Sequence, residues 1–262
     1  MELEQIELVR DGAVAVITLN RPQSGNALSS QMALELKRVA DTLDHDSEVR
    51  AVVLTGAGKH FCFGGDLKEF VQFDADPAKI TKTADDFHAA QLTLLGLAKP
   101  LIVAVNGVAA GGGLSMALIG DIVLVDEKAK FRVAYTAAGL SPDGGSTWLL
   151  PRVVGLRRAQ DLIFTNQDFS ADEAIEWGVG TRVVAAGTVL DEAIALAKRL
   201  AMGPTMAYAS SRKLLLSTFT NDFATQTDAE TAEIAANMSG RDGQEGMDAF
   251  INKRRPAFTG TQ

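Results

Sequence analysis

Short apolar runs and longer amphipathic stretches alternate along the first half of the chain. Runs rich in Val, Ile and Leu predict buried strands at residues 14–19, 51–54, 101–105 and 121–125. Between the first two, residues 30–43 place apolar side chains at helical spacing. Helices that connect neighbouring strands in this order form right-handed crossovers between parallel strands. The pattern therefore predicts an α/β fold.

Helical patterns dominate the chain after about residue 145. Ser170 and Glu173 form the sequence signature of a capping box, which opens a short helix that ends at Gly178. A short strand is expected at residues 181–184. The segment from about 70 to 80 is polar and irregular, and we expect it to be mobile. Further helices are expected at residues 188–202, 204–217 and 222–238.

Composition limits the functions that fit this chain. The 262 residues are 47% hydrophobic, with a mean hydropathy of +0.08, which suffices for one large core. The net charge of −8 argues against a nucleic-acid surface. The acidic first residues lack the order of a signal peptide, and no apolar run approaches the ~18 residues of a membrane span. We therefore expect a cytoplasmic protein with no membrane contact. The single cysteine, Cys62, excludes an internal disulfide and is expected to be a packed thiol.

Two glycine-rich turns carry the candidate chemistry. The first spans residues 61–68 and the second residues 106–113, and each follows a predicted strand and precedes a predicted helix. A glycine at such a junction lets a backbone N–H approach a ligand without a Cβ in the way. At a helix start that N–H has no intrahelical partner and lies at the positive end of the helix dipole. Two such donors that converge on one oxygen would form an oxyanion hole.

With these turns in place, the chain resembles the enoyl-CoA hydratase/isomerase (crotonase) superfamily over most of its length. The resemblance implies a crotonase-type spiral of β-β-α turns with a C-terminal helical trimerisation region. Residues 1–195 would form the acyl-CoA-binding catalytic core and residues 196–262 the helical oligomerisation region, in a homotrimer or a dimer of trimers. The motifs that carry the resemblance are Ile17-Thr18-Leu19-Asn20-Arg21-Pro22, Asn26-Ala27-Leu28, both glycine turns, Asp121-Ile122-Val123, the run 139–145, and Arg254, Pro256 and Phe258.

By this resemblance, the oxyanion donors are the N–H groups of Gly65 and Gly112. Hydratases of the family use two glutamates downstream of the glycine triplet, but the corresponding positions here are Ser115 and Tyr135. Neither side chain is a competent base at neutral pH, since tyrosine titrates near about 10. Both stay candidates for substrate binding, because their hydroxyl groups could position a water.

Asp143 is the remaining acidic candidate. Several branches of the family place an acidic residue at this position, and the run 142–152 is most similar to the isomerases of phenylacetyl-CoA breakdown. One carboxylate suffices for isomerisation, because it can take a proton from one carbon and return it to another. We expect an apolar surrounding that raises the pKa of Asp143 towards neutrality. The alternative is that Asp143 only caps the helix expected to open at Gly144.

The same resemblance implies CoA contacts, mainly through backbone groups of the loop after the first strand and of the first glycine turn. Lys68 and the tail run that begins at Lys253 are candidates for phosphate contacts, with the tail reaching a neighbouring subunit; a solvated charged tail is the alternative. His45, His60 and His88 lack metal-ligand spacing, so no metal is expected, and no cofactor beyond the CoA of the substrate. The implied CoA contacts are Gln23, Ser24, Ala27, Gly64, Asp66 and Leu67.

Together these features predict an acyl-CoA isomerase that shifts a double bond, or isomerises a ring epoxide, through a thioester enolate held in the oxyanion hole. Asp143 would carry the proton. An enoyl-CoA hydratase, a dehalogenase or hydrolase, and a non-catalytic acyl-CoA-binding protein stay open as alternatives. The pattern does not identify the acyl group.

Overall fold

A six-stranded sheet forms the centre of the computed structural model, which describes residues 2–74 and 76–260. Its strand order is β1-β2-β3-β4-β6-β9, in which β1 is antiparallel to β2 and the other neighbouring pairs are parallel. The parallel pairs confirm the predicted α/β class. The strands of this sheet are β1 (Ile6–Asp11), β2 (Val14–Leu19), β3 (Ala51–Gly56), β4 (Leu101–Val105), β6 (Ile122–Asp126) and β9 (Arg182–Val184).

A smaller sheet with the order β5-β7-β8 lies beside the second glycine turn. Its first strand is part of that turn, so the small sheet fixes the turn from one side. The rings of Phe131 and Phe169 stack inside this layer with their centroids 5.1 Å apart, and both side chains are buried. The strands of this sheet are β5 (Ala109–Ala110), β7 (Lys130–Arg132) and β8 (Phe169–Ser170).

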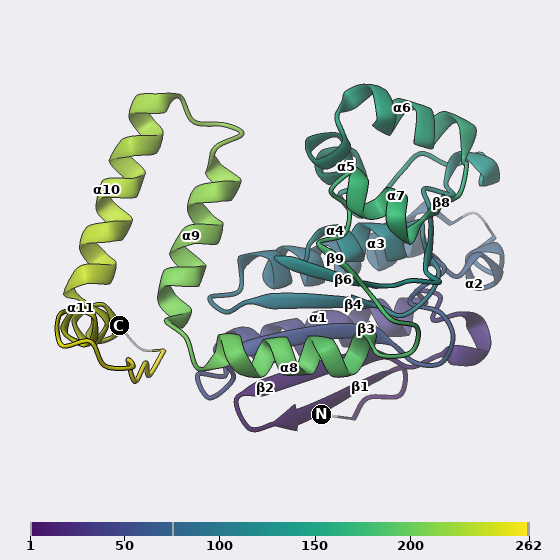
Figure 1. Cartoon of the computed structure of the whole chain (residues 1–262). Coiled ribbons are helices and arrows are strands. Elements are labelled where there is room, and N and C mark those ends of the chain that lie inside the picture. The colour runs from purple at the N-terminus through teal and green to yellow at the C-terminus, as the bar shows by residue number, and fades with distance from the viewer. Residues whose placement is uncertain (1, 75, 261–262) are drawn as a thin grey trace.

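The helices divide into those that cover the large sheet, those that cap one end and those that leave the core (Figure 1). Single turns of 3-10 helix occur at Pro22–Ser24 and Thr136–Ala138. The α-helices are α1 (Ser30–His45), α2 (Leu67–Val71), α3 (Pro77–Gly96), α4 (Gly112–Leu118), α5 (Ser146–Val154), α6 (Leu156–Thr165), α7 (Ala171–Glu176), α8 (Val189–Ala201), α9 (Thr205–Ser217), α10 (Phe223–Ser239) and α11 (Arg241–Ile251).

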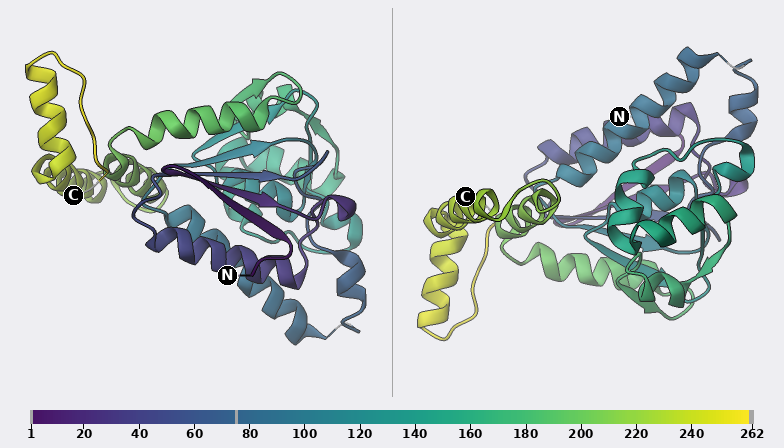
Figure 2. Two further views of the ribbon diagram at one scale, coloured as in Figure 1. Left: turned by 90° about the horizontal axis from the view of Figure 1, so that it is seen from below. Right: turned by 90° about the horizontal axis from the view of Figure 1, so that it is seen from above.

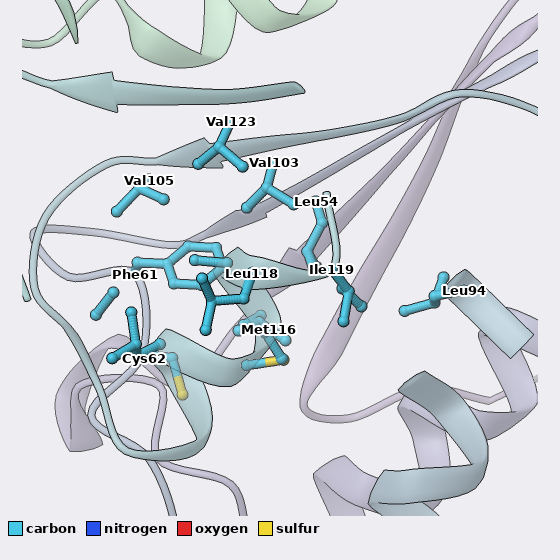
Figure 3. Packing of buried hydrophobic residues seen from close by; sticks show 14 of the residues in the cluster. Leu54, Phe61, Cys62, Leu94, Val103, Val105, Met116, Leu118, Ile119 and Val123 are labelled. Atoms are coloured by element: carbon cyan, nitrogen blue, oxygen red, sulfur yellow. The ribbon is translucent and has the colours of Figure 1, made fainter. Parts of the chain in front are cut away.

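The two faces of the large sheet bury their side chains against different helices. Alternate residues of a strand point to opposite faces. Leu54 and Val103 therefore join the core that includes side chains of α1, α3 and α4, where Figure 3 shows them near Phe61. Val53 and Ile102 join a second core against α8. Because both faces are covered, strands β3 and β4 are apolar at nearly every position, as is typical of parallel sheets.

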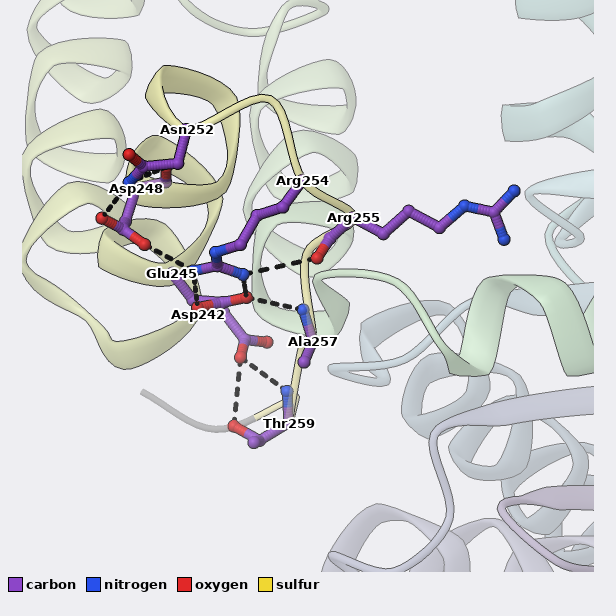
Figure 4. A network of polar contacts seen from close by, with 8 residues as sticks. All are labelled: Asp242, Glu245, Asp248, Asn252, Arg254, Arg255, Ala257 and Thr259. Carbon is purple, nitrogen blue, oxygen red and sulfur yellow. Dashed lines mark hydrogen bonds and ion pairs between the residues drawn. The ribbon is translucent and has the colours of Figure 1, made fainter.

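Helices α9 to α11 form an arm that projects from the rest of the molecule (Figure 2). The side chains of Phe223 and Phe250 on this arm are 85% and 86% exposed. The tail after α11 runs back towards the sheet, where Arg50 donates hydrogen bonds to the carbonyl oxygens of Phe258 at 3.1 Å and Gly203 at 2.7 Å. Within the arm, a polar network centred on Arg254 fixes the start of the tail (Figure 4).

Most predicted elements are confirmed. The strands at residues 14–19 and 101–105 are present with the predicted bounds, and Ser170 and Glu173 form the predicted capping box. The irregular segment expected at residues 70 to 80 is shorter than predicted, because α2 ends at Val71 and α3 begins at Pro77. Residues 72–74 and 76 are irregular as expected, and residue 75 lies outside the described residues. The rest of α3 and the whole of α11 were not predicted.

The expected division between residues 195 and 196 falls inside α8. This helix packs on the large sheet through Val189, Ala193 and Ala197. By packing, therefore, all of α8 belongs to the core, and the arm begins with α9 at Thr205.

Candidate active site

The two glycine-rich turns lie side by side. Cys62 and Ala109 form a parallel bridge, and the Ala110 N–H donates to the Cys62 carbonyl oxygen at 2.9 Å. A Cβ on Gly64 would lie 2.9 Å from the Ala110 carbonyl oxygen and 3.1 Å from the Gly112 nitrogen. Only glycine allows this approach, and its φ of +90° is also one that other residues rarely adopt. The first turn is thus packed directly against the start of α4.

The backbone N–H of Gly65, in the first turn, and that of Gly112, in the second, have no acceptor among the described residues. Gly65 and Leu28 form a parallel bridge, in which the Leu28 N–H donates to the Gly64 carbonyl oxygen and the Asp66 N–H donates to the Leu28 carbonyl oxygen. The Gly65 N–H takes no part in this bridge. Gly112 is the first residue of α4, where an N–H has no intrahelical partner. Unpaired N–H donors on adjacent turns are what an oxyanion hole requires.

Three hydroxyl groups hold the backbone of Asp143 by its carbonyl oxygen. Ser115 Oγ donates at 3.1 Å, Tyr135 Oη at 3.1 Å and Ser146 Oγ at 2.8 Å. Ser115 comes from α4, Tyr135 follows β7, and Ser146 begins α5. The two residues expected at the glutamate positions of hydratases therefore fix the turn that contains the carboxylate.

The side chain of Asp143 pairs with His88, whose Nε2 lies 2.7 Å from Asp143 Oδ1. The Asp143 and His88 side chains are 47% and 40% exposed. The expected apolar surrounding of Asp143 is therefore wrong, because the carboxylate is half open and has a polar partner. The capping alternative is also wrong, since α5 begins at Ser146 with Gly145 as its N-cap and has no side-chain cap.

Helix α3 brings the Asp143 turn and the second glycine turn together. A Cβ on Gly112 would lie 3.6 Å from the ring of Phe87, and a Cβ on Gly144 would lie 2.7 Å from the same ring. The side chain of Gln91, one turn further along α3, donates to the Gly144 carbonyl oxygen at 3.0 Å. Phe87 thus lies against both turns, and the Asp143 turn lies next to α4, the helix that begins at Gly112.

Burial decides which side chains of the site can exchange protons. It raises the pKa of Tyr135 above its usual range, so the phenol stays protonated and acts as a hydrogen-bond donor. Burial likewise raises the pKa of Cys62 to about 12, which confirms the packed thiol. Neither Tyr135 nor Cys62 is therefore suited to take up a proton from a substrate, which leaves the paired side chains of Asp143 and His88 as the acid–base candidates of this site.

The residues implied as CoA contacts surround the first glycine turn. Gln23 and Ser24 end the 3-10 turn after β2, and the adjacent Gly25 accepts a hydrogen bond from the Phe63 N–H at 3.0 Å. Leu67 and Lys68 are exposed next to this loop. The loop after β2 and the first glycine turn are therefore one continuous surface.

Asp66 and Ala27 have structural partners as well. The Asp66 carboxylate caps α2 by accepting from the N–H groups of Lys68 and Glu69, and it forms an ion pair with Arg21 at 2.9 Å. Arg21 also donates to the Ala27 carbonyl oxygen at 2.6 Å. The side chain of Asp66 is thus occupied by the protein, which leaves backbone groups as its means of contacting a ligand.

Lys253 does not join the other site residues within one chain. It follows α11 on the arm, while the glycine turns lie in the core (Figure 1). A contact between this lysine and a bound CoA would therefore need the arm of a neighbouring subunit, which stays a prediction.

No three His, Cys, Asp or Glu side chains in the described part of the chain are grouped as a metal site would need. Among the helices of residues 2–74 and 76–260, none combines the length and apolar character needed to cross a membrane.

Sequence reasoning missed His88, Phe87 and Gln91 as site residues. They lie on α3, which was not predicted, and His88 is 55 positions from Asp143. An amphipathic pattern over residues 83–94, with Phe87, Ala90 and Leu94 buried, was the available signal for this helix. Nothing in the sequence spacing indicated the pairing itself.

Comparison with known proteins places this geometry among enzymes of one family. The family profile described as Enoyl-CoA hydratase/isomerase matches residues 10–261. The 1,2-epoxyphenylacetyl-CoA isomerase of Escherichia coli (strain K12) is 40% identical over 249 residues, which cover 94% of this chain and 95% of that protein. The short-chain-enoyl-CoA hydratase of Clostridium acetobutylicum is 35% identical over 97% of each protein. The crystal structure of an enoyl-CoA hydratase from Polaromonas sp. JS666 has a TM-score of 0.93 at 31% identity, and covers 97% of this chain and 99% of that chain.

Proposed function

Because this chain belongs to the enoyl-CoA hydratase/isomerase family, we propose that it is an acyl-CoA isomerase in which Asp143 carries the proton. One observation carries the proposal. The Asp143 turn is bonded to Ser115 on α4, the helix that begins at Gly112, while Ser115 and Tyr135 bind the Asp143 backbone and supply no carboxylate. The site thus contains one carboxylate base, which suits isomerisation better than the addition of water.

In the proposed reaction, the thioester carbonyl oxygen of the substrate binds the N–H groups of Gly65 and Gly112. Asp143 removes a proton from a substrate carbon, and the electron pair of the broken C–H bond delocalises onto the carbonyl oxygen. The two donors stabilise this enolate, and loss of one donor typically costs ~2.7–4 kcal/mol. Asp143 then returns a proton to a second carbon, which completes the shift of the double bond.

The substrate is an acyl-CoA thioester, in agreement with the family, and CoA enters as part of the substrate. The isomerase named above acts on a ring-epoxide thioester by its name, which supports ring-epoxide isomerisation as the second form of this proposal. We further propose a cytoplasmic homotrimer or dimer of trimers, in which the arm contributes the subunit contacts.

The test uses 3-enoyl-CoA thioesters and the ring-epoxide thioester of phenylacetate as substrates. Asp143→Asn keeps the shape of the side chain but removes its basicity. We expect it to bind the thioester normally and to lose turnover by about 10²- to 10⁴-fold. Asp172→Asn, which changes an exposed carboxylate on α7, is the matched control and should leave turnover unchanged.

Product analysis separates the alternatives. A water adduct as the main product from wild-type protein would show a hydratase, a function that the relative from Clostridium acetobutylicum has by its name. Binding without any exchange of protons on the thioester would show an acyl-CoA-binding protein. Full turnover of Asp143→Asn would overturn the role of this residue.

A further inference from the structure

His88 forms a hydrogen bond with the carboxylate of Asp143, the group that would take the proton from the substrate. Its Nε2 lies 2.7 Å from Asp143 Oδ1, and no other described residue forms a hydrogen bond with that carboxylate. Asp143 Oδ2 therefore has no partner in the described part of the chain and is free to meet a substrate. The two residues come from α3 and from the loop before α5, so tertiary packing creates the pair.

The backbone at Asp143 is held without His88. Its carbonyl oxygen already accepts hydrogen bonds from three hydroxyl groups. The next carbonyl oxygen, of Gly144, accepts from the buried Gln91. Since the turn is fixed by these bonds, the effect of His88 is directed at the carboxylate.

The pair has a route to solvent. The side chains of His88 and Asp143 are 40% and 47% exposed, and Nδ1 of His88 has no hydrogen-bond partner among the residues described. Imidazole is the side chain best suited to take up and release protons near neutral pH, through two distinct nitrogens. The other titratable group bonded to this turn, Tyr135, is partly buried and donates its hydrogen bond to the Asp143 carbonyl oxygen.

We propose that His88 acts through Asp143 as a proton relay to solvent, an inference that rests on the proposed isomerase function. In the resting pair, the Nε2–H of His88 donates to Oδ1 of the ionised Asp143, and Oδ2 takes the proton from the substrate carbon. Oδ2 then gives this proton to water, while Nε2 passes its proton to Oδ1 and Nδ1 takes a proton from water. The reloaded carboxyl group protonates the second carbon, and His88 regains its first tautomer by exchange with water, so the isomerisation has no net gain or loss of protons. The proton in the product then comes from solvent.

The experiment measures deuterium in the product formed in D2O, together with kcat and KM. His88→Gln keeps an N–H donor towards Asp143 but cannot accept a proton, and His88→Phe removes the hydrogen bond. The wild type should give a product labelled at the newly protonated carbon. We expect His88→Gln to leave KM unchanged, to lower kcat by less than the ~10²-fold loss of a direct acid–base group, and to lower the label severalfold. A purely structural role for His88 would alter kcat or folding without changing the label in molecules that do turn over.

Several results would overturn the relay. An unlabelled product from the wild type would do so without any variant, which matters if both variants fail to fold. Equal labelling by the wild type and His88→Gln would show that Asp143 exchanges with water directly. Failure of the proposed function is a separate result, since it appears as a water adduct or as full turnover by Asp143→Asn. In that case, exchange of the proton next to the thioester carbonyl in the same samples still reports on the relay.

Discussion

Tyr135 donates its hydrogen bond to the backbone carbonyl oxygen of Asp143, at 3.1 Å, and not to the carboxylate. Ser115, on α4, donates a hydrogen bond to the same oxygen. The two hydroxyl groups thus hold the backbone that carries the carboxylate and do not bond to the carboxylate itself. This relationship explains how a site with neither hydratase glutamate can still be ordered around one acid.

We expect Tyr135→Phe and Ser115→Ala each to lower the free energy of unfolding by about 0.5–1.5 kcal/mol, the usual net loss for one hydrogen bond. Both should reduce turnover far less than Asp143→Asn, because neither residue carries the proton. Urea denaturation and steady-state kinetics measure the two effects, with Ser211→Ala on α9 as the control. A dead Tyr135→Phe beside an active Asp143→Asn would assign the proton to the phenol.

The donor role of Gly112 can be separated from its size. Alanine at this position adds a methyl group 2.8 Å from Leu28 Cδ1 but keeps the N–H, whereas proline adds bulk and removes the N–H. Proline is tolerated at the first position of a helix. We expect Gly112→Pro to lose turnover at least about a hundredfold relative to Gly112→Ala, the loss expected for one oxyanion donor. Equal turnover of the two folded variants would move the oxyanion site elsewhere.

Gly64 should be the most sensitive position of the first turn. Alanine at this position would place its Cβ 2.9 Å from the Ala110 carbonyl oxygen and would have to adopt a φ of +90°. The backbone strain alone costs about 1–3 kcal/mol, so we expect the free energy of unfolding to fall by more than that. Gly139→Ala is the matched control, because its φ is +72° but nothing lies within 4 Å of the added Cβ. Thermal unfolding of both variants checks this difference, and equal losses would show that the close approach of the two turns costs nothing.

Assembly should depend on the exposed apolar side chains of the arm. Light scattering should return a multiple of three of the 27.8 kDa chain mass at micromolar concentration. Phe250→Glu should shift the protein towards smaller species, because it places a charge on a side chain that is 86% exposed in the single chain. Val71→Glu, on α2 and 78% exposed, is the control. A wild-type mass of one chain would overturn the expected trimer.

The tail should loosen in acid. Hydrogen bonds from Arg254 and from the Ala257 N–H lower the pKa of Glu245 from 4.5 to about 2. A carboxylate with a lowered folded-state pKa contributes stability above its unfolded pKa, and that contribution is lost as the pH falls through the folded-state value. The pH window is therefore about 4.5 down to about 2.

Arg254→Gln should accordingly increase hydrogen exchange in the tail at pH 6, and its difference from the wild type should shrink between pH 4.5 and 2. Arg255→Gln is the neighbouring control, since its side chain points away from the network in Figure 4. A difference that persists unchanged at pH 2 would show that the ion pair with Glu245 is not its source.

The sequence predicted those parts of the molecule whose local pattern and tertiary role agree. The strands at residues 14–19 and 101–105 are apolar because both sheet faces are covered, and Ser170 caps its helix through residues three positions away. The expected donors, Gly65 and Gly112, also lie in locally recognisable glycine-rich turns, and their role stays a prediction.

The surroundings of Asp143 could not be predicted in this way. Its openness and its bond to His88 depend on how α3 packs against α1 and against the Asp143 turn, which no local pattern encodes. Asp86 on α3 forms one ion pair with Lys82, four residues earlier on the same helix, and a second with Lys37 on α1. The second pair joins segments that are distant in the sequence. The expected pKa rise of Asp143 rested on burial, and burial is a property of the complete fold.

The pairing of the large sheet has a consequence for how the chain folds. Leu124 pairs with Arg182, and Val52 with Leu101, so neighbouring strands are joined by long intervening segments. Such pairing gives a high contact order, because each loop must be closed before its strand contributes stability. We therefore expect refolding to be slow for a chain of this size, with the apolar strands β3 and β4 exposed to aggregation until α8 covers their second face.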